Sequence, residues 1–128
     1  MERSRSITTT LLLAEDNEHV RRLLRLVLER NGYTVLEAQS ADEVLELARN
    51  HQGPIHSLLT NAVLPHMTVL QLEGQIRSLR PDIKVLCISG HAREALDRQG
   101  ILAPSTAFLQ KPFTPDVLLE KVREMLEG

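Results

Sequence analysis

The sequence contains one cysteine, no tryptophan, one tyrosine and two phenylalanines, and each scarcity excludes a class of function. A single cysteine, Cys87 within an apolar run, can form neither a disulfide framework nor a cysteine-based metal site. The aromatic residues Tyr33, Phe108 and Phe113 are too few to stack the bases of a single-stranded nucleic acid. Basic and acidic residues are interspersed at a net charge of −2, so the basic patch of a nucleic-acid-binding protein is missing too.

Long apolar segments are also missing. No run approaches the roughly 20 apolar residues that span a bilayer, and no segment of signal-peptide length follows the polar residues 1–6. The motifs of a phosphate-binding loop and of a nucleophile elbow are absent as well. We therefore expect a soluble cytoplasmic protein that is not an enzyme and contacts no membrane. Its 128 residues fit one domain, 1–128, with a core from about 9 to 127.

Five short apolar runs alternate with five segments of helical periodicity. The expected strands are residues 8–14, 33–38, 55–61, 83–88 and 106–109, and the expected helices with their caps are about 17–31, 40–51, 69–79, 91–98 and 114–127. Strands and helices that alternate in this way are typical of an α/β fold, in which helices cover both faces of a doubly wound parallel sheet.

Residues that commonly cap helices mark several of the expected helix starts. Asp16 or Asn17 can cap the first helix, and Thr114, which precedes a proline, can cap the last. Ser40 and Glu43 have the spacing of a capping box at the start of the second helix.

Polar side chains follow the ends of four expected strands. Glu15 and Asp16 follow the first strand, and Asn61 ends the third. Ser89 and Lys111 follow the fourth and fifth strands. Because the carboxyl ends of parallel strands meet at one edge of a sheet, where ligands bind, we expect these five side chains to form one site.

Each of these residue types has a functional and a purely structural interpretation. The adjacent carboxylates Glu15 and Asp16 suit a hard cation such as Mg²⁺, but a helix-capping acid with an incidental neighbour explains them equally well. A cis peptide between Lys111 and Pro112 would aim the ammonium group inward, whereas an isolated lysine is more often a surface residue. Ser89 can donate to an anion or only satisfy its own turn.

Three segments together resemble the receiver domain of two-component response regulators. They are residues 13–17 (LAEDN), 88–90 (ISG) and 108–113 (FLQKPF). The resemblance extends from residue 11 to residue 126, and residues 100–124 look most like receivers attached to hybrid sensor kinases. It implies a flavodoxin-like fold with five helices and a five-stranded parallel sheet in the order 2-1-3-4-5.

In that family, an aspartate at the end of the third strand accepts a phosphoryl group from a kinase phosphohistidine, with Mg²⁺ bound beside it. By resemblance, Asn61 occupies the position of this acceptor. The other assignments implied are Glu15, Asp16, Asn61 and the backbone carbonyl of Val63 as metal ligands, Ser89 as the hydroxyl, Lys111 as the cationic partner and Phe108 as the aromatic switch residue.

Asn61 departs from the family pattern, because its uncharged amide oxygen is a poor nucleophile and cannot form an acyl phosphate. The loss of one negative charge also weakens the Mg²⁺ site, and an ion pair of Lys111 with Glu15 and Asp16 can replace the metal. The following turn departs too, since Val69 stands where glycine is usual and disfavours a positive φ there.

We therefore expect a pseudo-receiver that acts through protein contacts, with a histidine kinase or another signalling protein as partner. The fourth helix, fifth strand and fifth helix would form the contact face, which also suits a homodimer. Two alternatives remain: a receiver phosphorylated at another acceptor, and the receiver fragment of a hybrid histidine kinase that serves as an interaction domain. The neutral Asn61 further predicts an inactive-like arrangement, with Phe108 turned outward and Ser89 away from Lys111.

Overall fold

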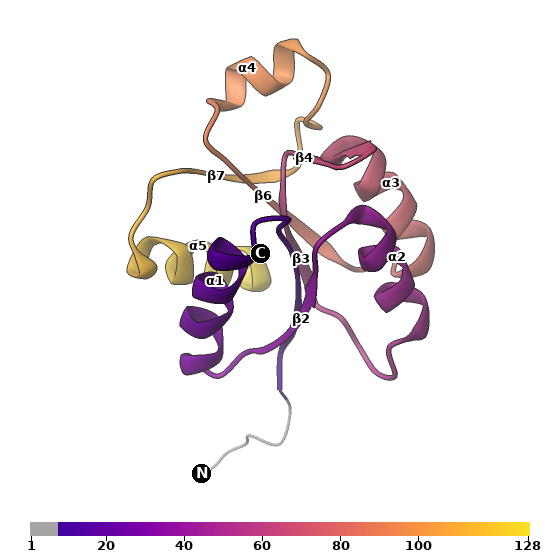
Figure 1. Ribbon diagram of the computed structural model, residues 1–128, viewed down its shortest axis with the longest axis vertical. Coiled ribbons are helices and arrows are strands. Elements are labelled where there is room, and N and C mark those ends of the chain that lie inside the picture. The colour runs from indigo at the N-terminus through magenta and orange to yellow at the C-terminus, as the bar shows by residue number, and fades with distance from the viewer. Residues whose placement is uncertain (1–7) are drawn as a thin grey trace.

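A five-stranded parallel sheet forms the centre of the protein in the computed structural model, which describes residues 8–128 (Figure 1). Its strands are β1 (Thr10–Ala14), β2 (Thr34–Ala38), β3 (Ser57–Asn61), β6 (Lys84–Ser89) and β7 (Ala107–Gln110), in the order β2-β1-β3-β6-β7. Counting only the strands of this sheet, the order is the expected 2-1-3-4-5. The polar start at residues 1–6 lies outside the described residues.

Five helices accompany this sheet in residues 8–128, as expected. They are α1 (Glu18–Arg30), α2 (Ala41–Asn50), α3 (Val69–Leu79), α4 (Arg93–Arg98) and α5 (Pro115–Glu127). In Figure 1, α1 and α5 lie on one side of the sheet, α2 and α3 lie on the other, and α4 stands beyond one end. The doubly wound α/β fold is therefore confirmed. Within the described residues, none of the helices combines the length and apolar character of a membrane span.

The central strand β1 is buried on both of its faces. Leu11 and Leu13 pack into the core cluster under α1 and α5, whereas Leu12 and Ala14 pack into the cluster under α2 and α3. All four side chains are at most 1% exposed. Successive side chains of a strand point to opposite faces, so a strand covered on both sides requires an uninterrupted apolar run.

The three predicted helix caps form, one of them incompletely. The Thr114 hydroxyl accepts from the Val117 N–H at 3.3 Å and caps α5. The Oδ1 atom of Asn17 accepts from the Val20 N–H at 3.0 Å and caps α1. The Ser40 hydroxyl accepts from the Glu43 N–H at 3.2 Å and caps α2. The Glu43 carboxylate, however, accepts from the N–H of Gln39 at 2.9 Å. The predicted capping box at α2 is thus half formed.

A small hairpin that the sequence did not predict follows β3. It pairs β4 (Val63–Leu64) with β5 (Met67–Thr68) in antiparallel fashion. The turn between them places His66 at a φ of 70°, in the left-handed region where histidine is less rare than most residues. Val69 is the buried first residue of α3 and does not have a positive φ. The unfavourable backbone conformation in this turn is therefore at His66.

Arg80, just after α3, ties the end of α2 to the rest of the fold. Its guanidinium group donates to three backbone carbonyls, those of Ala48 at 2.9 Å, His51 at 2.8 Å and Gly53 at 2.6 Å. A cation at a helix C-terminus also interacts favourably with the helix dipole. Arg80 therefore satisfies carbonyl groups that the end of α2 leaves without partners.

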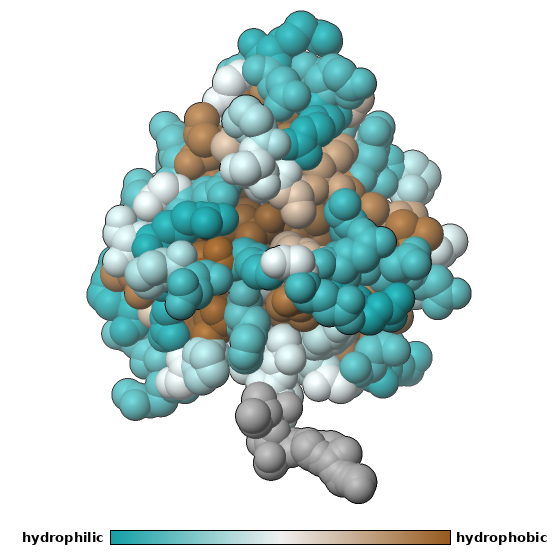
Figure 2. Space-filling model, turned by 180° about the vertical axis from the view of Figure 1, so that it is seen from behind, coloured by the Kyte–Doolittle hydropathy of each residue, from teal (hydrophilic) through white to brown (hydrophobic). Residues whose placement is uncertain are grey.

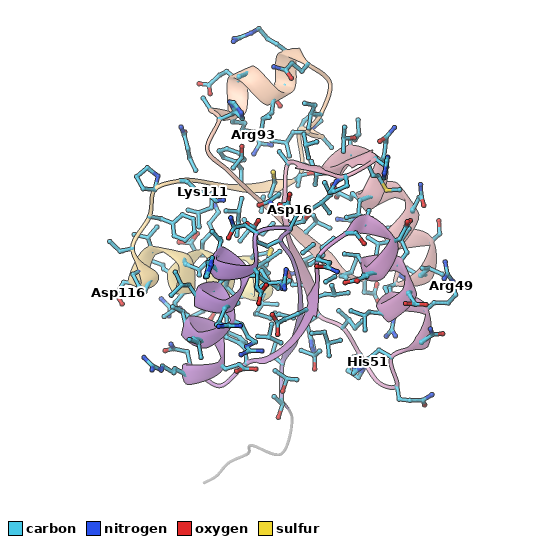
Figure 3. All side chains as sticks on the ribbon, in the orientation of Figure 1. Asp16, Arg49, His51, Arg93, Lys111 and Asp116 are labelled. Atoms are coloured by element: carbon cyan, nitrogen blue, oxygen red, sulfur yellow. The ribbon has the colours of Figure 1, made fainter. Side chains whose placement is uncertain are left out.

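We expect Arg80→Ala to lower the free energy of unfolding by about 2 kcal/mol, because three charge-assisted hydrogen bonds are lost at once. Urea titration followed by circular dichroism measures this loss. Arg49→Ala is the matched control, since Arg49 is an exposed arginine on the last turn of α2, the helix whose end Arg80 binds (Figure 3). Equal effects of the two substitutions would contradict the role assigned to Arg80.

Candidate functional site

The parallel sheet brings the five predicted polar residues to one edge. Glu15 and Asp16 directly follow β1, while Asn61 and Ser89 are the last residues of β3 and β6. Lys111 directly follows β7, and its backbone N–H donates to the Ser89 carbonyl at 2.8 Å. Figure 3 shows Asp16 and Lys111 at the same end of the sheet. The expectation of one polar site at this edge is met in the structure.

The Asn61 side chain joins the two acidic residues. Its Nδ2 atom donates to Oε2 of Glu15 at 3.0 Å and to Oδ1 of Asp16 at 3.2 Å. Ionised carboxylates only accept hydrogen bonds, so the nitrogen of the amide, and not its oxygen, must face them. Hydrogen bonds to a charged group are roughly twice as strong as neutral ones. Asn61 thereby holds two like charges close together.

Glu15 is the deepest carboxylate of the site, with 3% of the residue exposed. Its Oε2 atom also accepts from the Asn17 N–H at 2.9 Å. Its Oε1 atom has no hydrogen-bond partner within residues 8–128, and the Nζ atom of Lys111 lies 3.7 Å away. This distance makes an ion pair without a hydrogen bond. The predicted ion pair of Lys111 with the acids therefore forms with Glu15.

A cavity of about 280 Å³ opens beside this cluster, lined by Asn61, Val63, Ser89 and Lys111 among others. Ser89 is buried, and its hydroxyl oxygen accepts from the His91 N–H at 3.0 Å. The described residues contain no hydrogen bond between this hydroxyl and Lys111. Ser89 is thus held by its own turn.

The predicted outward position of Phe108 is wrong. Its side chain is partly buried and packs against the core cluster under α2 and α3. The guanidinium carbon of Arg93 lies 5.9 Å from the centroid of the Phe108 ring, within the range of a cation–π interaction. The apolar ring gains more from this packing than from solvent exposure, and Arg93 covers it.

Arg93 also clamps the segment that leads into β7. It donates to the carbonyls of Thr106 at 2.9 Å, Pro104 at 2.8 Å and Ala103 at 3.2 Å. No local pattern could reveal the clamp, because its acceptors are backbone atoms 10 to 13 residues further along the chain.

A buried carboxylate next to this clamp was also missed. Glu73 on α3 is 8% exposed and accepts from the Thr106 hydroxyl at 2.6 Å. Its second oxygen accepts from Arg77 at 2.8 Å. Thr106 therefore connects α3 to the start of β7, on the side of the sheet where Phe108 packs.

The site as arranged does not fit a divalent cation. Mg²⁺ takes oxygen ligands, whereas the group between Glu15 and Asp16 is the uncharged NH₂ group of the Asn61 amide, which is a hydrogen-bond donor. In the described part of the chain, no group of three or more histidine, cysteine, aspartate or glutamate side chains is placed to hold a metal ion. The predicted ligand set would need Asn61 to present its oxygen.

Comparisons with known proteins agree on one family. The sequence model of the response regulator receiver domain matches residues 11–123. The sensor kinase CckA of Brucella abortus is 37% identical over 120 residues, which are 94% of this chain but 13% of the kinase. The receiver protein CpdR of the same organism is 33% identical over 116 residues, which are 91% of this chain and 95% of CpdR.

Solved structures show the same likeness. The CheY-like receiver domain protein of Methanospirillum hungatei has a TM-score of 0.79 at 28% identity, covering 94% of this chain and 95% of that one. The receiver domain of the hybrid histidine kinase CckA has a TM-score of 0.77 at 28% identity, covering 91% of this chain and 98% of that one.

Cys87 on β6 is fully buried, and burial raises the pKa of its thiol to about 12 despite the opposing charge of Arg93. We expect a thiol reagent at pH 8 to react at least about 100-fold more slowly with the folded than with the unfolded protein, because the thiolate is the reactive form. Stopped-flow absorbance with and without guanidinium chloride measures both rates. Similar rates in the two states would contradict this expectation.

Proposed function

The chain belongs to the response regulator receiver domain family, and we propose that it is a pseudo-receiver that signals without phosphorylation at Asn61. Receiver domains are signalling modules of two-component systems, and the chain shares their fold. The proposal treats residues 1–128 as one receiver domain. It assigns Asn61 to the acceptor position, with Ser89 and Lys111 as its former partners in phosphoryl transfer.

The observation that carries this proposal is the state of Asn61. It ends β3 at the edge where the polar residues meet, and its side chain is neutral and bonded to Glu15 and Asp16. An amide oxygen is too weak a nucleophile to take a phosphoryl group. Removal of one carboxylate also lowers the charge available to Mg²⁺, so the proposal includes a weakened metal site.

The surroundings of Phe108 support a single signalling state. Arg93 covers its ring and holds the preceding segment, and Ser89 is engaged by its own turn. We expect binding partners to recognise the face of α4, β7 and α5 in this one arrangement. The end formed by α4 is mostly hydrophilic (Figure 2), while Val117 on α5 is 45% exposed. Such a mixed face suits a reversible contact with a histidine kinase, another signalling protein or a second copy.

A place within a hybrid histidine kinase is the second candidate. The match to the sensor kinase CckA favours it, since the chain corresponds to 13% of that protein. In that setting the domain would serve as an interaction module beside the catalytic parts of the kinase. Sequencing the gene that encodes this chain to both of its ends distinguishes the two settings.

Incubation with acetyl phosphate and Mg²⁺, followed by intact mass spectrometry, tests the pseudo-receiver proposal. We expect no adduct of about 80 Da, the mass of a phosphoryl group, on the wild-type chain. Asn61→Asp is the positive control and should gain the adduct, because it restores a carboxylate nucleophile. A base-labile adduct on the wild-type chain, at residue 61 or another side chain, would contradict the proposal and support a competent receiver.

We expect Arg93→Ala to lower the free energy of unfolding by about 2 kcal/mol, because it removes three hydrogen bonds and the cation–π contact. The Phe108 ring should also become more mobile. ¹⁹F NMR of protein labelled with fluorophenylalanine detects this change, and the Phe113→Leu variant shows which of the two signals belongs to Phe113. Arg98→Ala is the control, since Arg98 is exposed on the same helix. Unchanged stability and an unchanged Phe108 signal in Arg93→Ala would count against a fixed face.

A further inference from the structure

Three groups of the chain contact the acid pair. The Asn61 amide donates to Glu15 and Asp16, and the Asn17 N–H donates to Glu15. The Nζ atom of Lys111 lies 3.7 Å from the remaining Glu15 oxygen. Within residues 8–128, this is the one oxygen of the acid pair that is buried without a hydrogen-bond partner. The acids are therefore stabilised by one neutral amide, one backbone group and one ammonium group.

The charges of these groups explain why the amide matters. Glu15 and Asp16 contribute two negative charges and Lys111 one positive charge. An aspartate at position 61 would set a third carboxylate against oxygens that now lie 3.0 and 3.2 Å from the amide nitrogen. Carboxylates at such distances repel one another, and a bound cation relieves that repulsion. The amide of Asn61 supplies two N–H donors in place of this repulsion.

A divalent cation and the present amide orientation exclude each other. The cation needs oxygen ligands between Glu15 and Asp16, where the amide nitrogen now lies. To present its oxygen, the Asn61 amide must turn by half a rotation and give up both hydrogen bonds. Binding of the cation therefore has to offset the loss of two charge-assisted bonds, in addition to the missing third carboxylate.

We propose that Asn61 is a built-in substitute for the divalent cation. Its amide supplies the acid pair with hydrogen-bond donors, so that the domain is fully stable without Mg²⁺. The signalling state is then independent of metal as well as of phosphorylation. This inference goes beyond the pseudo-receiver proposal, because a chain that accepts no phosphoryl group can still be controlled by Mg²⁺.

Thermal unfolding of the wild-type protein, Asn61→Asp and Asn61→Ala tests the inference. Each protein is measured in EDTA and in millimolar MgCl₂, with NaCl added to equalise the ionic strength. Asn61→Asp adds a carboxylate, whereas Asn61→Ala removes the donors without adding charge. Circular dichroism reports the midpoint, so the readout does not depend on phosphoryl transfer.

We expect Mg²⁺ to move the wild-type midpoint by less than about 1 °C and to raise that of Asn61→Asp by about 5 °C or more, since a ligand stabilises only the state that binds it. In EDTA, both variants should unfold below the wild-type protein, and Asn61→Ala should stay insensitive to Mg²⁺. The inference is overturned if Mg²⁺ stabilises the wild-type protein as much as Asn61→Asp, or if Asn61→Ala matches the wild-type midpoint in EDTA.

The side-chain amide signals of Asn61 in a ¹H–¹⁵N NMR spectrum give a second readout on the wild-type protein alone. They are assigned by their absence from the Asn61→Ala spectrum. We expect slow hydrogen exchange and unchanged positions on addition of Mg²⁺. Fast exchange, or signals that shift with Mg²⁺, would overturn the inference. A wild-type protein that responds to Mg²⁺ yet gains no phosphoryl group would leave the pseudo-receiver proposal intact.

Discussion

The two hydrogen bonds from the Asn61 amide to Glu15 and Asp16 are the contacts on which the rest of the site depends. They join the end of β1 to the end of β3 across groups that would repel each other as free anions. Glu15 is almost fully buried, and a buried carboxylate is tolerated only with donors around it. The same amide therefore supports the fold at this edge, and in the proposed pseudo-receiver it stands where the family's nucleophile would be.

The face beside the site is held by contacts that do not involve Ser89 or Lys111. Arg93 binds the backbone before β7 and covers Phe108, and Thr106 bonds to the buried Glu73 on α3. These bonds connect α3, α4 and β7 directly. A face fixed in this way has a defined shape without phosphorylation at position 61. This agrees with a domain that its partners recognise in a single conformation.

The sheet and the site were predictable because both depend on short-range patterns. The helix expected at 69–79 is Val69–Leu79, and the third strand, expected at 55–61, is Ser57–Asn61. The hairpin after β3 was not predictable, because strands of two residues are too short to show alternation. The Arg93 clamp and the packing of Phe108 were missed for another reason. They depend on which backbone carbonyls the fold brings near a long side chain, and no local pattern records that.

Beryllofluoride is a mimic of the phosphoryl group and binds to the acceptor carboxylate. It tests most directly whether residue 61 alone prevents this site from binding a phosphoryl group. The account predicts that Mg²⁺ and beryllofluoride leave the backbone ¹H–¹⁵N spectrum of the wild-type protein unchanged. In Asn61→Asp, the signals around Ser89 and Lys111 should shift. Equal shifts in the wild-type protein would contradict the account, and so would an Asn61→Asp protein that does not respond.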